Sequence, residues 1–192
     1  MAANLNVDTK QQILEGTFAY LVRCGLENFS IRDLVKQISI TEGTIYYWYK
    51  NKDELICMAA EYGLRRISDR IFRNFYRDCP DIEKFFNTCL IYIDEVKKDL
   101  RFIYQVASSP VYGEILHNSN SRFRSTYNEY AKKLTELSNG DYNEIRPIIY
   151  SFASTIVDYA IWQDSEETQI QLDYYCKKLK IAMNIKEDTI TD

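Results

Sequence analysis

Apolar side chains recur through most of this chain at three- and four-residue intervals, the spacing of helices with one buried face. Over residues 9–24 they include Ile13, Phe18 and Leu21, and Gly25 follows as a stop signal. Glycine and proline number only six and three in 192 residues, so the connections between helices are short. The pattern predicts an all-α fold of about nine helices.

Two short helices follow the first one. Ser30 can cap a helix that ends near Gln37, and Thr41 can cap another that runs through about Tyr47. Because only a tight connection separates these helices, they cannot lie antiparallel and must cross. Crossed helices of this kind are typical of a helix-turn-helix, whose second helix can enter the major groove of DNA.

Helices continue to the end of the chain. A long fourth helix is expected from about residue 51 to residue 77. The remaining helices are predicted at residues 81–98, 100–107, 120–138, 143–163 and 166–184.

Charge and composition narrow the range of functions. Acidic residues outnumber basic residues by 28 to 24, but this does not exclude DNA binding, because counterion release depends on the local lysines, arginines and amides. The single histidine, His117, excludes a zinc site built on several imidazoles, and the five scattered cysteines exclude a disulfide framework. Since no nucleophile, base and orienting group occur at motif spacing, we expect no catalysis, no cofactor and no metal.

The location of the protein is also an expectation from sequence. Charged residues interrupt every apolar run before it reaches the length of a membrane span. The first residues lack the basic and apolar segments of a secretory signal. We therefore expect a cytoplasmic protein that does not enter a membrane, with buried, reduced thiols and with His117 in a loop.

Aromatic and lysine residues alternate where the third helix gives way to the fourth. Tyrosine hydroxyls, lysine ammonium groups and the amides of a helix N-terminus all suit phosphate oxygens. We assign Tyr46, Tyr47 and Lys52 to the DNA backbone, and we assign Ile45 and Tyr49 to the core.

A set of spaced features runs through residues 9–55. It comprises Ile13-Leu14, Phe18, Gly25, Ser30, Asp33-Leu34-Val35, Gly43-Thr44-Ile45-Tyr46 and Tyr49-Lys50-Asn51-Lys52-Asp53-Glu54-Leu55. With this set, the segment resembles the DNA-binding domain of the TetR family of bacterial transcription regulators. Two positions depart from the family pattern, because Trp48 stands where a histidine is common and Ser39 replaces the glycine that is usual at the turn.

The resemblance implies an all-helical homodimer that binds a palindromic operator in double-stranded DNA and responds to a small-molecule inducer. Residues 1–53 would form the DNA-binding domain, and residues 54–192 would form a helical domain for ligand binding and dimerisation. Together with the helix cap, the positions carried over to DNA contact are Arg32, Thr41, Glu42, Gly43, Thr44, Tyr46, Tyr47 and Lys52.

Three of these positions have a second interpretation. Arg32 can contact guanine or can pair with Glu27 or Asp33 on the surface. Glu42 can accept from a cytosine amino group or can simply favour the helix dipole. Gly43 can permit close approach of the backbone to DNA or can be a merely tolerated glycine.

The central helices hold many aromatic residues, most of which must fill the core. A pocket with a few polar groups is the usual small-molecule site, and carboxylates beside aromatic faces suit a cationic or polar aromatic ligand. The mixed aromatic and polar candidates for such a pocket are Tyr92, Asp94, Tyr127, Ser154, Asp158 and Trp162.

The last two long helices carry more apolar surface than a peripheral pair needs, so we expect the homodimer to form through them as a four-helix bundle. The apolar residues are Ile148, Ile149, Phe152, Ile156, Tyr159, Ala160, Ile170, Tyr174, Leu179 and Met183.

The leading interpretation is a repressor that a small molecule releases from a palindromic operator. In this hypothesis the ligand shifts the fourth helix and changes the spacing of the two recognition helices. The alternative is a helical small-molecule sensor or carrier whose helix-turn-helix mediates protein contacts. That alternative predicts no salt-dependent binding to duplex DNA.

Overall fold

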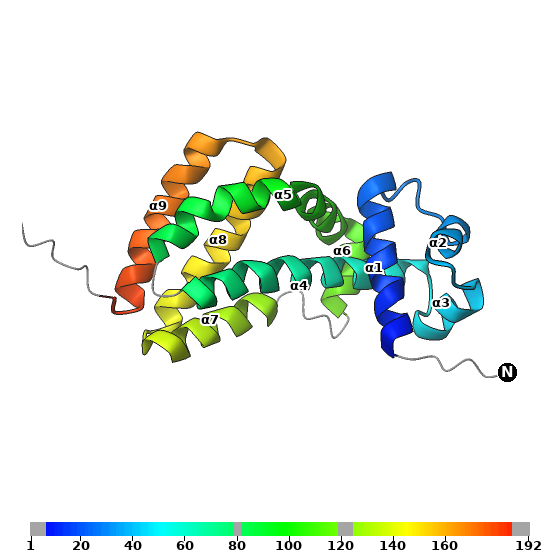
Figure 1. Ribbon diagram of the computed structural model, residues 1–192, viewed down its shortest axis with the longest axis horizontal. Coiled ribbons are helices and arrows are strands. Elements are labelled where there is room, and N and C mark those ends of the chain that lie inside the picture. Colours follow the sequence, from blue (N-terminus) through cyan, green and yellow to red (C-terminus); the bar gives the residue numbers. More distant parts are fainter. Residues whose placement is uncertain (1–6, 79–81, 119–124, 186–192) are drawn as a thin grey trace, which may run out of the picture. The chain divides into compact units, whose positions relative to one another are not determined.

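The computed structural model describes residues 7–78, 82–118 and 125–185, and within these ranges every regular element is a helix. The all-α prediction is therefore confirmed (Figure 1). Over the same ranges, no helix combines the length and the apolar character needed to cross a bilayer. The helices are α1 (Val7–Cys24), α2 (Ile31–Ile38), α3 (Glu42–Trp48), α4 (Lys52–Asp78), α5 (Ile82–Ser108), α6 (Pro110–Asn118), α7 (Ser125–Ser138), α8 (Tyr142–Trp162) and α9 (Ser165–Ala182).

The chain divides into two compact units. The first unit comprises residues 1–66 and 98–123, and the second comprises residues 67–97 and 124–192. Helices α1–α3 and α6 belong to the first unit, α7–α9 belong to the second, and α4 and α5 contribute residues to both. The division of function after residue 53 stays a prediction.

The core of the first unit joins α1 to the two short helices. Leu21, Leu34 and Ile45, which come from α1, α2 and α3 in turn, are buried. Phe18 of α1 meets Phe102 of α5 edge to face, with ring centroids 5.7 Å apart. Gly63 leaves room for the Phe18 ring, because a Cβ at this position would lie only 2.0 Å from it. Within this unit α1 packs against α2, and α2 packs against α3.

The second unit is built around α8, which packs against α7 on one side and α9 on another (Figure 1). Phe152 of α8 is buried and meets Phe86 of α5 at 5.5 Å between ring centroids. Tyr130 of α7 stacks on Phe72 of α4 at 3.8 Å, and its hydroxyl donates to Asp69 at 2.6 Å. Contacts between distant parts of the sequence therefore hold this unit together.

Two details of the sequence-based prediction are wrong. The expected break near residue 99 is absent, since α5 is continuous and Asp99 pairs with Arg66 of α4 at 2.6 Å. His117 lies in the last turn of α6 and is exposed, so it is not a loop residue. The predicted start of a helix at residue 120 lies outside the described residues.

The cysteines in the described ranges are free thiols. Cys57, Cys89 and Cys176 are buried, and Cys24 is partly buried, whereas Cys79 lies outside the described residues. Burial raises the pKa of Cys57 to about 11 and that of Cys89 to about 12. These two thiols therefore stay protonated and unreactive near neutral pH.

Candidate nucleic-acid interface

Helix α3 is anchored by its apolar side and exposes the opposite side. Ile45 and Tyr49 are buried, which confirms their assignment to the core. Burial, with a smaller contribution from the Glu54 carboxylate, raises the pKa of Tyr49 well above its usual range. Tyr46 and Tyr47 are 50% and 65% exposed. Two tyrosine hydroxyls are thus presented to solvent from a fixed helix.

The start of α3 is held by local hydrogen bonds. The N–H of Thr44 donates to Oγ1 of Thr41 at 3.2 Å, which confirms Thr41 as the N-cap. The two threonine hydroxyls also lie 2.9 Å apart within hydrogen-bonding reach. Ser39 in the preceding turn has φ 55° and ψ 40°, so it adopts the left-handed conformation that glycine favours. These contacts set the crossing of α2 and α3.

The backbone of α3 is open at Gly43. A Cβ built there would meet only the Oγ1 of Thr41, at 3.8 Å, which is ordinary contact distance. The fold itself therefore has room for alanine at this position. Internal packing therefore gives no reason for a glycine at this position.

Two charged candidates flank this open backbone. Arg32 of α2 is exposed and makes no ion pair with any residue in the described part of the chain. Asp33, one of its expected alternative partners, pairs instead with Lys36 at 3.2 Å. Glu42 is exposed in the first turn of α3, where a carboxylate favours the helix dipole.

Lys52 is exposed, and its ammonium group contacts Phe29. Its Nζ donates to the carbonyl oxygen of Phe29 at 2.7 Å and lies 5.3 Å from the centroid of the Phe29 ring. Sequence spacing gave no sign of this contact, since the two residues are 23 positions apart.

Trp48 lies at the end of α3 and is half-buried. The ammonium group of Lys10 lies 5.5 Å from the centroid of its ring, and Tyr47 meets the ring edge to face at 5.1 Å. The indole N–H is buried and has no hydrogen-bond partner within the described ranges. Lys10 thus belongs to the surroundings of α3, although the sequence pattern did not single it out.

Two exposed arginines of α4 make ion pairs with α5. Arg70 pairs with Glu95 of α5 at 3.0 Å and lies 4.5 Å from the centroid of the Tyr92 ring. Arg66 pairs with Asp99 in the same way.

The six ligand-site candidates are not gathered in one interior pocket. Ser154, Asp158 and Trp162 lie on the exposed side of α8, and Trp162 is 74% exposed. They recur at four-residue spacing, so they share one face of the helix, and that face is at the surface of this unit.

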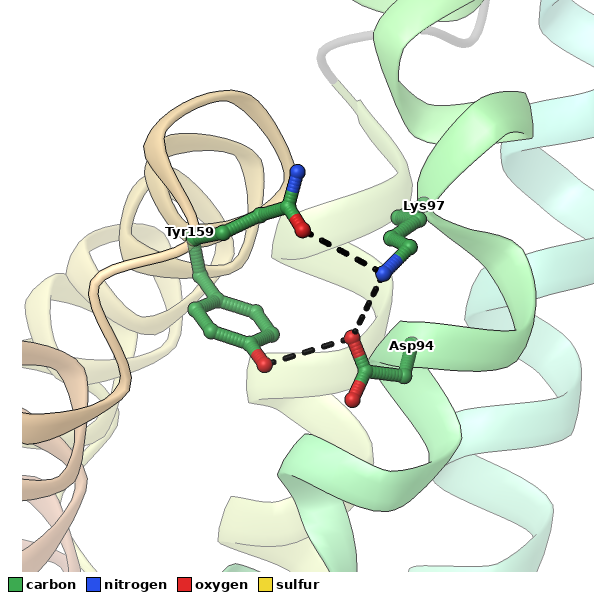
Figure 2. Close-up of polar contacts among 4 residues, drawn as sticks. Asp94, Lys97 and Tyr159 are labelled. Carbon is green, nitrogen blue, oxygen red and sulfur yellow. Dashed lines mark hydrogen bonds and ion pairs between the residues drawn. The ribbon is translucent and has the colours of Figure 1, made fainter.

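Asp94 belongs to a polar cluster between α5 and the end of α8. Its Oδ1 accepts from the hydroxyl of Tyr159 at 3.2 Å and pairs with Lys97 at 3.2 Å (Figure 2). Lys97 also donates to Oε1 of Gln163 at 3.4 Å. The Asp94–Lys97 pair is readable as an i,i+3 contact, but the two α8 partners are about 65 residues away and leave no sequence signal.

Tyr92 and Tyr127 have separate environments. Tyr127 is half-buried and meets Tyr150 edge to face at 5.9 Å, and burial raises its pKa to about 12. Tyr92 lies beneath the Arg70 guanidinium.

A groove runs between α8 and α9. Its lining is partly apolar and includes Pro147, Ile148, Tyr174 and Ile181. None of the six ligand-site candidates lines it. The apolar residues predicted to form the dimer fall into two groups. Ile170 and Tyr174 are exposed, whereas most of the others fill the core of their own unit. Those buried residues are Ile149, Phe152, Ile156, Tyr159, Ala160, Leu179 and Met183.

The N-terminal segment has clear relatives. Residues 13–57 match the family model of bacterial regulatory proteins of the tetR family. An uncharacterized HTH-type transcriptional regulator of Haemophilus influenzae is 32% identical over 79 residues, which are 41% of this chain and 40% of that protein. The HTH-type transcriptional regulator PksA of Bacillus subtilis is 25% identical over 92 residues, which are 48% of this chain and 45% of that protein. The matches thus span less than half the length of these curated relatives.

Solved structures share the fold over most of the chain. A TerR/AcrR-family transcriptional regulator from Aquifex aeolicus aligns with a TM-score of 0.53 at 17% identity, covering 90% of this chain and 98% of that one. Thermus thermophilus FadR, a TetR-family transcriptional repressor in complex with lauroyl-CoA, aligns with a TM-score of 0.54 at 13% identity, covering 95% and 99%. At these identities the likeness concerns the fold.

The fold defines a class of proteins in which a helix-turn-helix is joined to further helices, as it is over the described residues of this chain. Within that class, residues 13–57 are similar to the bacterial regulatory proteins of the tetR family.

Proposed function

We propose that this protein is a ligand-responsive transcriptional regulator that binds a palindromic DNA operator as a homodimer, and that it acts as a repressor. The observation that carries the proposal is the exposed side of α3, where Tyr46 and Tyr47 project from a helix whose other side is anchored by Ile45. The match of residues 13–57 to the tetR family model supports a role for this side, because the second helix of a helix-turn-helix enters the major groove.

The proposed interface combines groups suited to bases and to phosphates. Arg32 has the donors for guanine, and the open backbone at Gly43 allows close approach to a groove wall. Tyr46 and Tyr47 offer hydroxyls to phosphate oxygens. Thr41 and Thr44 shape the start of the helix, so their contribution combines any direct contact with the geometry that they hold. Glu42 favours the helix dipole beside them.

A homodimer supplies the spacing that a palindrome needs. Two recognition helices must reach half-sites about 34 Å apart, which is one turn of DNA. Ile170, Tyr174 and Ile181 are exposed along one stripe of α9, and the groove between α8 and α9 lies beside them. Burying this apolar stripe against a second copy favours association through the last two helices.

The regulatory ligand is a small molecule bound by the helices that follow the helix-turn-helix. The structure of FadR contains lauroyl-CoA, which supports a ligand role for a helical fold of this kind. Tyr92, Asp94 and Tyr127 remain candidate lining residues from the original set. Ser154, Asp158 and Trp162 suit the surface of α8 better, because they are exposed.

Genomic fragments retained by the purified protein, once sequenced, would supply an operator. Fluorescence anisotropy against that duplex would then compare the wild type with Tyr46→Phe and Tyr47→Phe, which remove only the hydroxyls. We expect each substitution to raise Kd by about two- to tenfold, the effect of losing one hydrogen bond. Tyr104→Phe is the matched control, since Tyr104 of α5 is exposed to a similar degree, 48%. Its Kd should equal that of the wild type.

Retention of no duplex at low salt would contradict the proposal and favour a sensor that uses the helix-turn-helix for protein contacts. If DNA is bound, candidate small molecules are titrated into the complex. A ligand that lowers affinity identifies the inducer, and a ligand that raises affinity would show that the protein is a co-repressor-dependent regulator instead.

A further inference from the structure

We propose that Lys10 of α1 is a phosphate contact, so that the DNA interface extends from the helix-turn-helix to the first helix of the chain. The observation that carries the proposal is the place of its ammonium group, which lies over the Trp48 ring at the end of α3. The proposal rests on the proposed function, because it adds one contact to the same interface.

The first argument is how the fold brings Lys10 to α3. Lys10 lies in the first turn of α1, and Trp48 and Tyr49 lie at the end of α3. The hydroxyl of the buried Tyr49 donates to the carbonyl oxygen of Lys10 at 3.5 Å, across 39 positions of sequence. The start of α1 therefore lies beside the end of α3.

The second argument is that the ammonium group is held in place while its donors stay available. Nζ of Lys10 lies 5.5 Å from the centroid of the Trp48 ring, which is cation–π distance. The ring attracts the charge but is no oxygen acceptor, so N–H donors that point away from it can meet a phosphate. Lys10 is exposed, and within the described ranges no oxygen accepts from its ammonium group. A side chain that is already held loses less rotamer freedom on binding.

The third argument is the neighbour of Lys10 on the same indole. Tyr47 meets the Trp48 ring edge to face at 5.1 Å between centroids and is 65% exposed. The proposed function assigns the Tyr47 hydroxyl to the DNA backbone. Phosphates of one strand recur about every 3.4 Å along the axis of the duplex. A hydroxyl and an ammonium group that flank one indole can therefore reach neighbouring phosphates.

The indole itself offers no donor to DNA. The N–H of Trp48 is buried and has no hydrogen-bond partner within the described ranges. What Trp48 supplies is thus an aromatic face for Lys10. The lysine, rather than the indole, is the donor that this contact presents to a phosphate.

The experiment measures operator affinity as a function of salt, with the duplex recovered from genomic fragments. We expect Lys10→Met to make the slope of log K against log[salt] shallower by about 0.9, the effect of losing one phosphate contact. The same loss should raise Kd by up to about eightfold at 0.1 M salt. Arginine keeps the charge and can also lie over an aromatic ring, so Lys10→Arg should keep the wild-type slope.

Lys133→Met is the matched control. Lys133 of α7 is also exposed, and its ammonium group lies 5.6 Å from the centroid of the Tyr130 ring. The substitution therefore removes one charge and one cation–π contact outside the helix-turn-helix. Its slope and its Kd should equal those of the wild type.

A second measurement identifies the phosphate. A series of operators is prepared in which one phosphate at a time is replaced by a neutral methylphosphonate. The wild type should lose affinity at each contacted position. Lys10→Met should be insensitive to the replacement at one of these positions and should keep the wild-type sensitivity at the others.

Three outcomes would overturn the proposal while wild-type binding stays intact. An unchanged slope in Lys10→Met would do so even if Kd rises, because a rise in Kd alone would reflect lost packing on Trp48. An equal change of slope in Lys133→Met would show an effect of net charge. A Lys10→Met protein that keeps every methylphosphonate sensitivity of the wild type would show that Lys10 meets no phosphate.

Failure of the proposed function gives a different result. In that case the wild type itself shows no salt-dependent binding to duplex DNA, and the Lys10 contact is refuted together with the interface to which it belongs.

Discussion

In both the helix-turn-helix and the bundle of α7, α8 and α9, a helix ends at a residue in the left-handed conformation, but the side chain of that residue has a different role in each region. Ser39 after α2 and Gln163 after α8 both adopt the left-handed conformation, with φ of 55° and 59°. Ser39 lies in the short turn that leads directly into α3. Gln163 instead carries a side chain whose Oε1 accepts from Lys97 of another helix. One region is shaped by neighbours in sequence and the other by neighbours in space.

This difference extends to the stabilising contacts of each region. The caps of α2, α3 and α4 are side-chain-to-backbone bonds over three or four residues. The second unit depends on contacts such as Phe86 with Phe152 and Tyr130 with Asp69, which join residues more than sixty positions apart. Local contacts allow a recognition surface to keep its shape on a small scaffold, whereas stability comes from the larger core.

The largest expected effect is in the long-range core. Phe152→Ala removes a buried ring that contacts both Phe85 and Phe86, so it should lower the free energy of unfolding by about 3 to 5 kcal/mol. Denaturant unfolding followed by circular dichroism measures this change. Ser154→Ala, on the exposed side of the same helix, is the control and should change stability by less than about 0.5 kcal/mol. A loss below about 1 kcal/mol for Phe152→Ala would mean that this region does not depend on its core.

The next effect is on alkaline stability. Burial raises the pKa of Tyr127 to about 12 in the folded protein, against 10.0 for the unperturbed group. The unfolded chain therefore loses this proton first, so the stabilisation is complete below pH 10 and is lost as pH rises toward 12. At pH 11 this difference in pKa lowers the free energy of unfolding by about 1 kcal/mol relative to its value below pH 10. Unfolding curves at pH 9 and pH 11 should show that Tyr127→Phe is less sensitive to alkali than the wild type, whereas the exposed Tyr174→Phe behaves like the wild type.

The same distinction explains how much the sequence could predict. Ser30, Thr41 and Tyr49 took their predicted places because caps and apolar spacing act over a few residues. The assignment of Lys52 to phosphate stays a prediction, whereas its contact with Phe29 could not be predicted, because only the fold brings Phe29 to it. Trp162 looked like a pocket residue by composition, but the face of α8 that is covered depends on how α7 and α9 pack.

A smaller effect is expected at the two left-handed residues, Ser39 and Gln163. Ser39→Gly should raise the free energy of unfolding by about 1 kcal/mol, because the left-handed conformation is unfavourable for a residue with a Cβ. Gln163→Gly relieves similar strain but also removes the acceptor for Lys97, so its gain should be smaller. Chemical denaturation of both variants measures the difference. Equal gains would show that Gln163 contributes no useful long-range contact.

The smallest effect on stability has the greatest consequence for function. Gly43→Ala should leave the fold intact or stabilise it by up to about 1 kcal/mol, since the new Cβ meets only Thr41 Oγ1 at 3.8 Å and alanine favours helix. If the backbone of α3 lies against DNA, the same methyl group should weaken operator binding at least tenfold, as measured by fluorescence anisotropy. Opposite signs for stability and affinity would identify a glycine that serves recognition.

Gly63→Ala supplies the contrast, because its Cβ would clash with the Phe18 ring and should lower stability. An unchanged operator affinity in Gly43→Ala would show that α3 meets DNA through its side chains alone.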